Sequence, residues 1–256
     1  MARNKAKRQN VLKLVEPQLY AVPAKQKKTD EIRLDQLKSF DALTDNQKEF
    51  FNFYQEGIEF ITLHGVAGTG KTFCALYKAL EQVLDRSNKY RKVAIIRSSV
   101  QSRDMGFLPG SADDKMNIYK QPYQQICEIL FGRRDAWSRL EEQEVVEFLS
   151  TSFMRGTSFN NTILIVDECQ NMNAGELSTI ITRVGDNSKI ILCGDFRQTD
   201  LLKRTNDVSG LKDFFEIIKR MNSARKVEFG VEDIVRSSLV KEFIIASLAY
   251  EDSCKS

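Results

Sequence analysis

The chain has 256 residues, of which 42% are hydrophobic and 29% charged, and its formal net charge is +3. This composition is typical of a globular protein with one substantial core. No apolar run approaches the roughly 20 residues of a membrane span, and no secretory signal is apparent. We therefore expect a cytoplasmic protein without a membrane partner. Because His64 is the only histidine, histidine–cysteine zinc sites and triads with a histidine base are both disfavoured.

The N-terminal stretch is strongly basic. Residues 1–28 hold eight Lys or Arg and one acid, a charge of +7, which leaves +3 − 7 = −4 for the rest. We therefore predict a basic N-terminal extension over residues 1–35, with one short strand near Val11–Val15, and a single domain over residues 36–256. Such a tail is typical of an arm that binds a polyanion, although a solvated terminus has the same composition.

The remaining sequence alternates strand-like and helical patterns. Thr44 or Asp45 can cap a helix that carries Phe50, Phe51 and Tyr54 at helical spacing. Continuous apolar runs rich in β-branched residues predict strands at Phe60–Leu63, Val93–Ile96, Ile163–Val166 and Ile190–Cys193, with a fifth at Val227–Phe229. Helical patterns cover Phe73–Leu84, Tyr123–Phe131, Glu141–Leu149 and Leu239–Tyr250. This alternation predicts an α/β fold with a mostly parallel sheet and helices on both faces.

The first strand runs directly into a phosphate-binding pattern, and a helix follows it. The pattern reads Gly65-Val66-Ala67-Gly68-Thr69-Gly70-Lys71-Thr72. Its glycines let backbone N–H groups surround phosphate oxygens at the positive end of the helix, Lys71 can reach the β and γ phosphates, and Thr72 can ligate Mg²⁺. These eight residues therefore predict a P-loop that binds ATP with Mg²⁺.

Polar residues end the other predicted strands at the same edge of the sheet, where ligands bind in such folds. Asp167 ends a buried strand and can hold the magnesium shell. Glu168 follows it, pointing the other way along the pleat, and can orient or polarise the attacking water. Two weaker signals are Gln198, a candidate sensor of the γ-phosphate, and Gln47, whose amide could pair with adenine.

Several segments together resemble the PhoH family. They are Thr44-x-Asn46-Gln47, the P-loop, Gly106-Phe107-Leu108-Pro109-Gly110, Phe153-Met154-Arg155-Gly156, Asp167-Glu168-x-Gln170-Asn171, Gly194-Asp195-x-x-Gln198-x-Asp200 and Asp233-Ile234-Val235-Arg236. The resemblance spans roughly residues 40–245 and implies a RecA-like P-loop NTPase, similar to one ATPase core of superfamily 1 helicases. The compact length and basic tail are similar to PhoH-like proteins of tailed bacteriophages, which would place the protein in the host cytoplasm.

The resemblance further implies ATP binding, an association with phosphate starvation, a role in RNA metabolism and assembly into a ring, as a homo-oligomer and possible hexamer. Two departures stand out: Arg97-Ser98-Ser99-Val100 replaces the usual Arg-Pro-Ala-Val, and Thr157 replaces a common arginine.

Three functions remain open from the sequence. The first is an ATP hydrolase acting on RNA or single-stranded nucleic acid, and the second is a nucleotide-gated RNA-binding or assembly module with little turnover. The third, a small-molecule kinase, lacks an arginine-rich lid segment. Because the chain has room for only one core, we expect an arginine to complete the site across a subunit boundary; Arg236 is the first candidate, followed by Arg155 and then Arg197.

Overall fold

The computed structural model describes residues 31–98, 112–151, 154, 156, 158–195 and 207–253, with the backbone alone for residues 112–115, 207–212 and 252. The helices are α1 (Asp45–Gln55), α2 (Lys71–Leu84), α3 (Ala112–Phe131), α4 (Ala136–Glu142), α5 (Ala174–Ile181), α6 (Asp207–Lys219) and α7 (Ser238–Ser253). The strands are β1 (Phe60–Gly65), β2 (Lys92–Arg97), β3 (Val146–Ser150), β4 (Thr162–Asp167), β5 (Lys189–Gly194) and β6 (Ala224–Phe229). Short 3-10 helices cover Leu34–Gln36 and Cys169–Asn171.

The six strands form one sheet in the order β3-β2-β4-β5-β1-β6, and every neighbouring pair is parallel. Every residue of β1, β4 and β5 is buried, as expected for strands covered on both faces. The predicted α/β class, with a parallel sheet and helices on both faces, is confirmed. All five predicted strands are present, and each extends beyond its apolar run by one to three residues.

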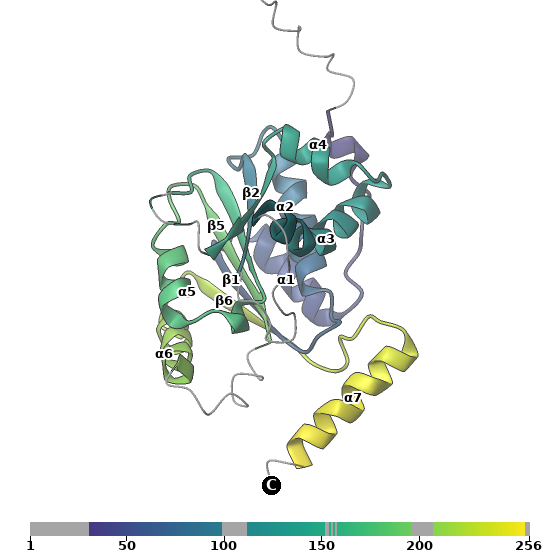
Figure 1. Cartoon of the computed structure of the whole chain (residues 1–256), viewed down its shortest axis with the longest axis vertical. Coiled ribbons are helices and arrows are strands. Elements are labelled where there is room, and N and C mark those ends of the chain that lie inside the picture. Colours follow the sequence, from purple (N-terminus) through teal and green to yellow (C-terminus); the bar gives the residue numbers. More distant parts are fainter. Residues whose placement is uncertain are drawn as a thin grey trace, which may run out of the picture. The chain divides into compact units, whose positions relative to one another are not determined.

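Helices cover both faces of the sheet (Figure 1). On one face, Ile61 and Leu63 of β1 pack in a core with residues of α1, α2, α3 and α4. On the other face, Phe60 of β1 packs in a second core with residues of α5 and α6. The alternation of neighbouring β1 residues between two cores follows from the period of two in a strand.

The helix predicted at Glu141–Leu149 is wrong. Helix α4 ends at Glu142, Glu144 adopts a left-handed backbone with φ 59°, and the chain continues as the edge strand β3. The glutamates favour a helix. However, Val146 and Phe148 alternate with half-buried residues and are buried against the helices, and this tertiary packing overrides local preference.

Residues just before the predicted boundary at residue 36 make contacts with the rest of the domain. Ile32 is buried, its N–H donates to Gln143 Oε1, and its carbonyl accepts from Gln143 Nε2. The short strand predicted near Val11–Val15 and the basic residues 1–28 lie outside the described residues. Among the helices that the structure describes, none has both the length and the apolar character needed to cross a membrane.

A lysine is fully buried at the start of β5. The Lys189 ammonium lies 3.6 Å from the centroid of the Tyr54 ring and 5.7 Å from that of Tyr90, and it donates to the Tyr54 carbonyl at 3.5 Å. Burial, together with the nearby ammonium of Lys89, lowers the pKa of Lys189 to about 8. This site is at the amino end of the strand, whereas the P-loop follows the carboxyl end of neighbouring β1.

Candidate nucleotide site

The P-loop has the geometry that the sequence predicts. Gly68 and Gly70 have φ of 79° and 80°, in the left-handed region that favours glycine, and Gly70 directly precedes α2. A Cβ at Gly65 would lie 2.0 Å from the Phe229 carbonyl oxygen, because the end of β6 passes against the loop and accepts from Val66 N–H at 3.2 Å. Glycine is therefore required at Gly65 by packing as well as by its φ of 137°.

The Lys71 ammonium bonds to the loop itself. It donates to the carbonyl oxygens of Gly65 at 2.9 Å and Val66 at 2.7 Å. Burial lowers the pKa of Lys71, although the nearby acidic side chains of Asp195, Glu168 and Asp167 oppose this effect. To reach a phosphate oxygen, Lys71 must release these carbonyls.

Asp167 accepts two hydrogen bonds at the end of β4. Its Oδ1 accepts from the Thr72 hydroxyl and its Oδ2 from the Tyr123 hydroxyl, both at 2.8 Å. Burial raises the pKa of Asp167, and both hydrogen bonds counteract this by favouring the carboxylate. Burial, with Asp167 nearby, raises the pKa of Tyr123 well above its usual value, so Tyr123 stays protonated as a donor.

The Thr72–Asp167 pair fits Mg²⁺. A hydroxyl and a carboxylate are hard oxygen donors, and Mg²⁺ is commonly held by one or two carboxylates together with substrate phosphates. No group of three or more His, Cys, Asp or Glu that could hold a metal occurs among the described residues. The pair suits a metal whose remaining ligands are phosphate oxygens and water.

Glu168 has left the strand, so the expected alternation along the pleat is wrong. Its backbone is left-handed, with φ 51° and ψ 40°, and it precedes the 3-10 helix Cys169–Asn171. This conformation is uncommon for a residue with a side chain. The Glu168 carboxylate accepts from Gln170 Nε2 at 2.5 Å, and Glu168 lines the same cleft as Lys71.

Gln47 is 3% exposed and already bonded within the protein. Its Oε1 accepts from Leu43 N–H at 2.8 Å, and its Nε2 donates to the Thr69 carbonyl at 3.0 Å. These two bonds hold the P-loop against the start of α1, where the Thr44 side chain caps the helix as predicted. An amide has two donors and two acceptor lone pairs, so each half of Gln47 retains one, and contact with adenine stays a prediction.

Arg236 lies beside the P-loop of its own chain. A Cβ at Gly68 would be 3.0 Å from Arg236 Cγ, and Val235 N–H donates to the Gly68 carbonyl at 3.1 Å. The turn before it is held by buried Asp233, whose Oδ2 accepts from Asn46 Nδ2 and from the N–H of Gly230. Arg236 thus lies beside the P-loop of its own chain, and its predicted action across a subunit boundary stays a prediction.

These groups line one cleft of about 980 Å³. The cleft brings together most of the predicted site residues, namely Gln47, Ala67, Gly68, Thr69, Gly70, Lys71, Thr72, Asp167, Glu168 and Arg236. Apolar side chains of Phe40, Leu43 and Phe51 form another part of its wall. Charged groups for phosphates and an apolar wall for a base thus meet in one hollow, as in ligand pockets generally.

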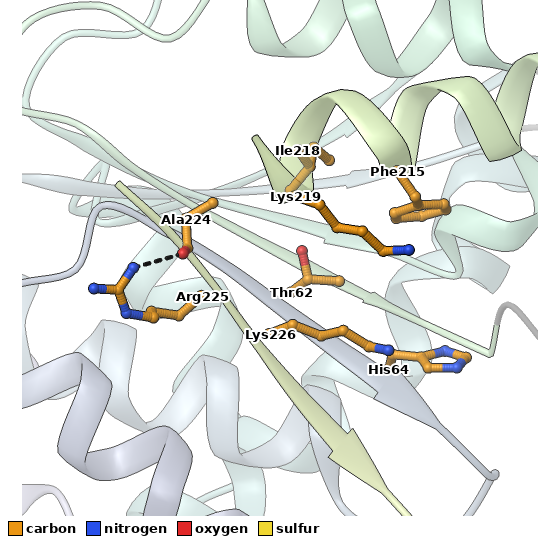
Figure 2. A pocket seen from close by; sticks show the side chains of 8 residues that line it. All are labelled: Thr62, His64, Phe215, Ile218, Lys219, Ala224, Arg225 and Lys226. Atoms are coloured by element: carbon orange, nitrogen blue, oxygen red, sulfur yellow. Dashed lines mark hydrogen bonds between the residues drawn. The ribbon is translucent and has the colours of Figure 1, made fainter. Parts of the chain in front are cut away.

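A second cavity, of about 240 Å³, lies between β1, β6 and α6. Figure 2 shows Thr62 between Lys219, which extends from α6, and Lys226, which extends from β6. Both ammonium groups are already paired with carboxylates, Lys219 with Glu216 and Lys226 with Glu228. The cavity is smaller than the roughly 300–1,000 Å³ of most ligand pockets, so the larger cleft is the better nucleotide site.

Some predicted residues cannot be located. Gln198, Arg155, Arg197 and the segment Gly106–Gly110 lie outside the described residues. Their predicted roles stay predictions.

Comparison with known proteins identifies the family of the chain. The sequence model of the family described as "PhoH-like protein" matches residues 39–248. The chain belongs to the PhoH-like family. It is 33% identical over 183 residues to the PhoH-like protein of Bacillus subtilis, covering 71% of this chain and 56% of that one. It is also 33% identical over 196 residues to Protein PhoH of Escherichia coli K12, covering 75% and 53%.

This PhoH-like chain thus spans about half the length of the curated relatives that it matches. Among solved structures, it is similar to the DUF1998 helicase MrfA bound to DNA, with a TM-score of 0.45 and 10% identity, covering 79% of this chain and 28% of that one.

Two contributors to the PhoH-like site were not predicted. Tyr123 contacts Asp167 across 44 positions of sequence, and no local pattern distinguishes it from the other apolar residues of its helix. Gln170 contacts Glu168 two positions away. Its place in the Asp167-Glu168-x-Gln170-Asn171 segment was a usable signal, although no role had been assigned to it.

Proposed function

We propose that this PhoH-like chain binds ATP with Mg²⁺ in the large cleft and hydrolyses it, in a cycle coupled to RNA or single-stranded nucleic acid. The observation that carries the proposal is the meeting of Lys71, Thr72, Asp167 and Glu168 in one cleft at the carboxyl edge of the sheet. Phosphoryl transfer from ATP depends mainly on positioning and on compensation of charge. The four residues supply both.

The P-loop would bind the phosphates through its backbone N–H groups and the amino end of α2. Lys71 would exchange the carbonyls of Gly65 and Val66 for phosphate oxygens. The exchange replaces two neutral acceptors with charged ones, which form stronger hydrogen bonds. Nucleotide binding should therefore be strongest when the phosphates carry their full charge.

Thr72 and Asp167 would hold Mg²⁺ in place of their present mutual hydrogen bond. When bound, Mg²⁺ neutralises charge on the β- and γ-phosphate oxygens. Tyr123 would keep its bond to Asp167 Oδ2 and so preserve the orientation of the carboxylate. Removing the Thr72 hydroxyl should weaken nucleotide binding only when Mg²⁺ is present.

Glu168 would orient the attacking water and accept its proton. A carboxylate at the cleft wall, adjacent to the metal-binding position, suits this role. Gln198 would sense the γ-phosphate, as expected from its position after β5. The presence of a carboxylate that can activate water favours hydrolysis over binding alone.

Arg236 would compensate charge on the γ-phosphate within its own chain. The Cγ of its side chain lies beside its own Gly68, and action on a neighbouring copy, the initial expectation, is the alternative. An added arginine can raise the rate of phosphoryl transfer by about 10³ to 10⁵. Assembly into a homo-oligomer, including a hexamer, remains part of the proposal on the basis of the family resemblance.

Nucleic-acid binding is proposed from charge. Residues 1–28 carry eight cations and one acid, and each phosphate that they neutralise should add about 0.7 to the log–log dependence of affinity on salt for single strands. Deleting residues 1–28 should weaken binding to single-stranded RNA and flatten this slope. An unchanged slope would assign the tail to a solvated extension.

The main test measures phosphate release and nucleotide affinity together. Lys71→Ala should lose ATP binding, whereas Glu168→Gln should bind ATP but hydrolyse it at least about 100-fold more slowly. Lys219→Ala and Glu216→Gln are matched controls, because they alter an exposed ion pair on α6 outside the cleft. Activity is measured with and without single-stranded RNA and DNA.

Each outcome has a distinct meaning. Stimulation by RNA or DNA supports the coupling, and hydrolysis without stimulation restricts the proposal to an ATPase. Tight ATP binding with negligible turnover by the unaltered chain would identify the second candidate, a nucleotide-gated binding module. Full hydrolysis by Glu168→Gln would remove Glu168 from the catalytic role.

A further inference from the structure

Gln170 connects two strand ends at the wall of the cleft. Its side-chain Nε2 donates to Glu168 Oε2 at 2.5 Å, and its Oε1 accepts from the backbone N–H of Asp195 at 3.2 Å. Glu168 follows β4, and Asp195 follows β5. One amide therefore bridges the carboxylate proposed to activate water and the carboxyl end of the neighbouring strand.

The partners define which way the amide faces. The Asp195 N–H can only donate, so it requires the amide oxygen, and an ionised Glu168 carboxylate can only accept, so it requires the amide nitrogen. With the amide reversed, two donors would face each other on one side and two acceptors on the other. Both sides of Gln170 are thus specified by chemistry.

The surrounding turn leaves little freedom for this bridge. Cys169 Sγ donates to the Cys193 carbonyl at 3.0 Å, which fastens the turn to β5 beside Gln170. A Cβ at Gly194 would lie 2.6 Å from Gln170 Oε1 and 2.7 Å from Cys169 Sγ. Glycine at position 194 is therefore required for the turn to lie this close to the strand.

Glu168 needs such support because of its backbone. The left-handed conformation of Glu168, with φ 51°, takes it out of the strand, so the ladder of the sheet no longer orients its side chain. A glutamate side chain has three rotatable bonds and samples many positions unless a partner restricts it. Gln170 supplies that restriction from a rigid strand end.

We propose that Gln170 is a positioning residue for hydrolysis: it holds the Glu168 carboxylate in the orientation that serves the attacking water. The inference rests on the proposed ATPase function. Gln170 acts through Glu168 and takes no part in binding the nucleotide. Because a displacement of about 1 Å from the reacting geometry can lower a rate about 100-fold, loss of the amide nitrogen should lower kcat and leave nucleotide affinity unchanged.

The competing role for Gln170 is a purely structural one, in which only its bond to Asp195 matters. Gln170→Glu separates the two roles, since it keeps an acceptor for the Asp195 N–H and removes the donor to Glu168. Gln170→Met removes both bonds at similar length and without charge. Gln143→Glu is the matched control: Gln143 likewise bridges to backbone, accepting from Ile32 N–H and donating to the Ile32 carbonyl, away from the cleft.

The experiment measures kcat, the Kd for a non-hydrolysable ATP analogue and the thermal midpoint for all three variants. Both Gln170 variants should lose about tenfold to 100-fold in kcat. The uncharged Gln170→Met should keep its Kd within about twofold of the unaltered chain, whereas the added charge of Gln170→Glu can also weaken binding of the anionic analogue. Gln143→Glu should keep its kcat. If Gln170→Glu retains kcat within about twofold while the unaltered chain hydrolyses ATP, Gln170 is only a structural clamp and the inference is overturned.

A double variant tests whether Gln170 acts through Glu168, and it remains informative even if Gln170→Glu does not fold. If the inference holds, Glu168→Gln combined with Gln170→Met should be no slower than Glu168→Gln alone, because the positioned group is already absent. Additive losses would show an independent role and overturn the inference. Absence of hydrolysis by the unaltered chain would instead overturn the proposed function, and this inference with it.

Discussion

The buried Lys189 predicts a stability that rises with pH. In an unfolded chain the pKa of lysine is about 10.4, whereas burial lowers that of Lys189 in the fold to about 8. The charge of Glu59 raises the pKa of Lys189, but Glu59 is also paired with Lys89. The positive charge of Lys78 lowers the pKa of Lys189. The unfolded chain thus binds the proton more tightly, and the free energy of unfolding must increase between about pH 8 and 10.4.

The size of the effect follows from these two pKa values. Tighter proton binding by Lys189 in the unfolded chain lowers the free energy of unfolding, relative to a chain with no titrating group at this position. The decrease is about 3 kcal/mol at pH 7 and about 1 kcal/mol at pH 9.5, a difference of about 2 kcal/mol. Lys189→Met removes the titrating group and keeps an unbranched side chain. We expect the variant to be more stable than the unaltered chain at pH 7 and to lose about 2 kcal/mol of that advantage by pH 9.5.

Urea unfolding of both proteins at the two pH values measures the change. The quantity compared is the difference in free energy of unfolding between the two proteins at each pH. Effects of packing are the same at both pH values, and other titrating groups are the same in both proteins, so both cancel. Lys219→Met is the control, because the Lys219 side chain is 62% exposed and lacks the burial on which the prediction depends. The reasoning is refuted if the Lys189→Met difference in free energy of unfolding is the same at both pH values.

Three further predictions concern the cleft. Gly65→Ala should lower the free energy of unfolding, measured in urea, by at least about 2 kcal/mol and weaken ATP-analogue binding. The reason is that the added Cβ would meet the Phe229 carbonyl. Unchanged binding would contradict this packing argument. Tyr123→Phe should cost about 1.5–3 kcal/mol of stability and weaken analogue binding in Mg²⁺ but not in EDTA, since it removes a bond to Asp167. Arg236→Ala should lower kcat at least about tenfold. Mixing it with an inactive Lys71→Ala chain should restore no activity, and recovery would show action between copies.

How much the sequence predicts depends on how local each interaction is. Eight consecutive residues predict the P-loop. The strand before it and the helix after it are each predicted from their own pattern of apolar residues. Strand β3 is not predictable in this way, because Val146 and Phe148 become an edge strand only by packing against distant helices. The Tyr123–Asp167 bond depends on tertiary structure, and the departure of Glu168 from β4 depends on the turn that Gly194 admits.

The P-loop is supported by stretches from both ends of the domain, and this matters for synthesis of the protein. Gln47 bonds to Thr69, Phe229 accepts from Val66, and Val235 donates to Gly68. The 165 residues that follow Lys71, up to and including Arg236 (236 − 71), take roughly ten to thirty seconds to translate at about 5–20 residues per second. For most of that interval the growing chain carries the phosphate-binding sequence and Gln47, but lacks the C-terminal supports Phe229 and Val235. Under the proposed function, ATP would stabilise the finished fold by mass action, and only after these C-terminal supports have been made.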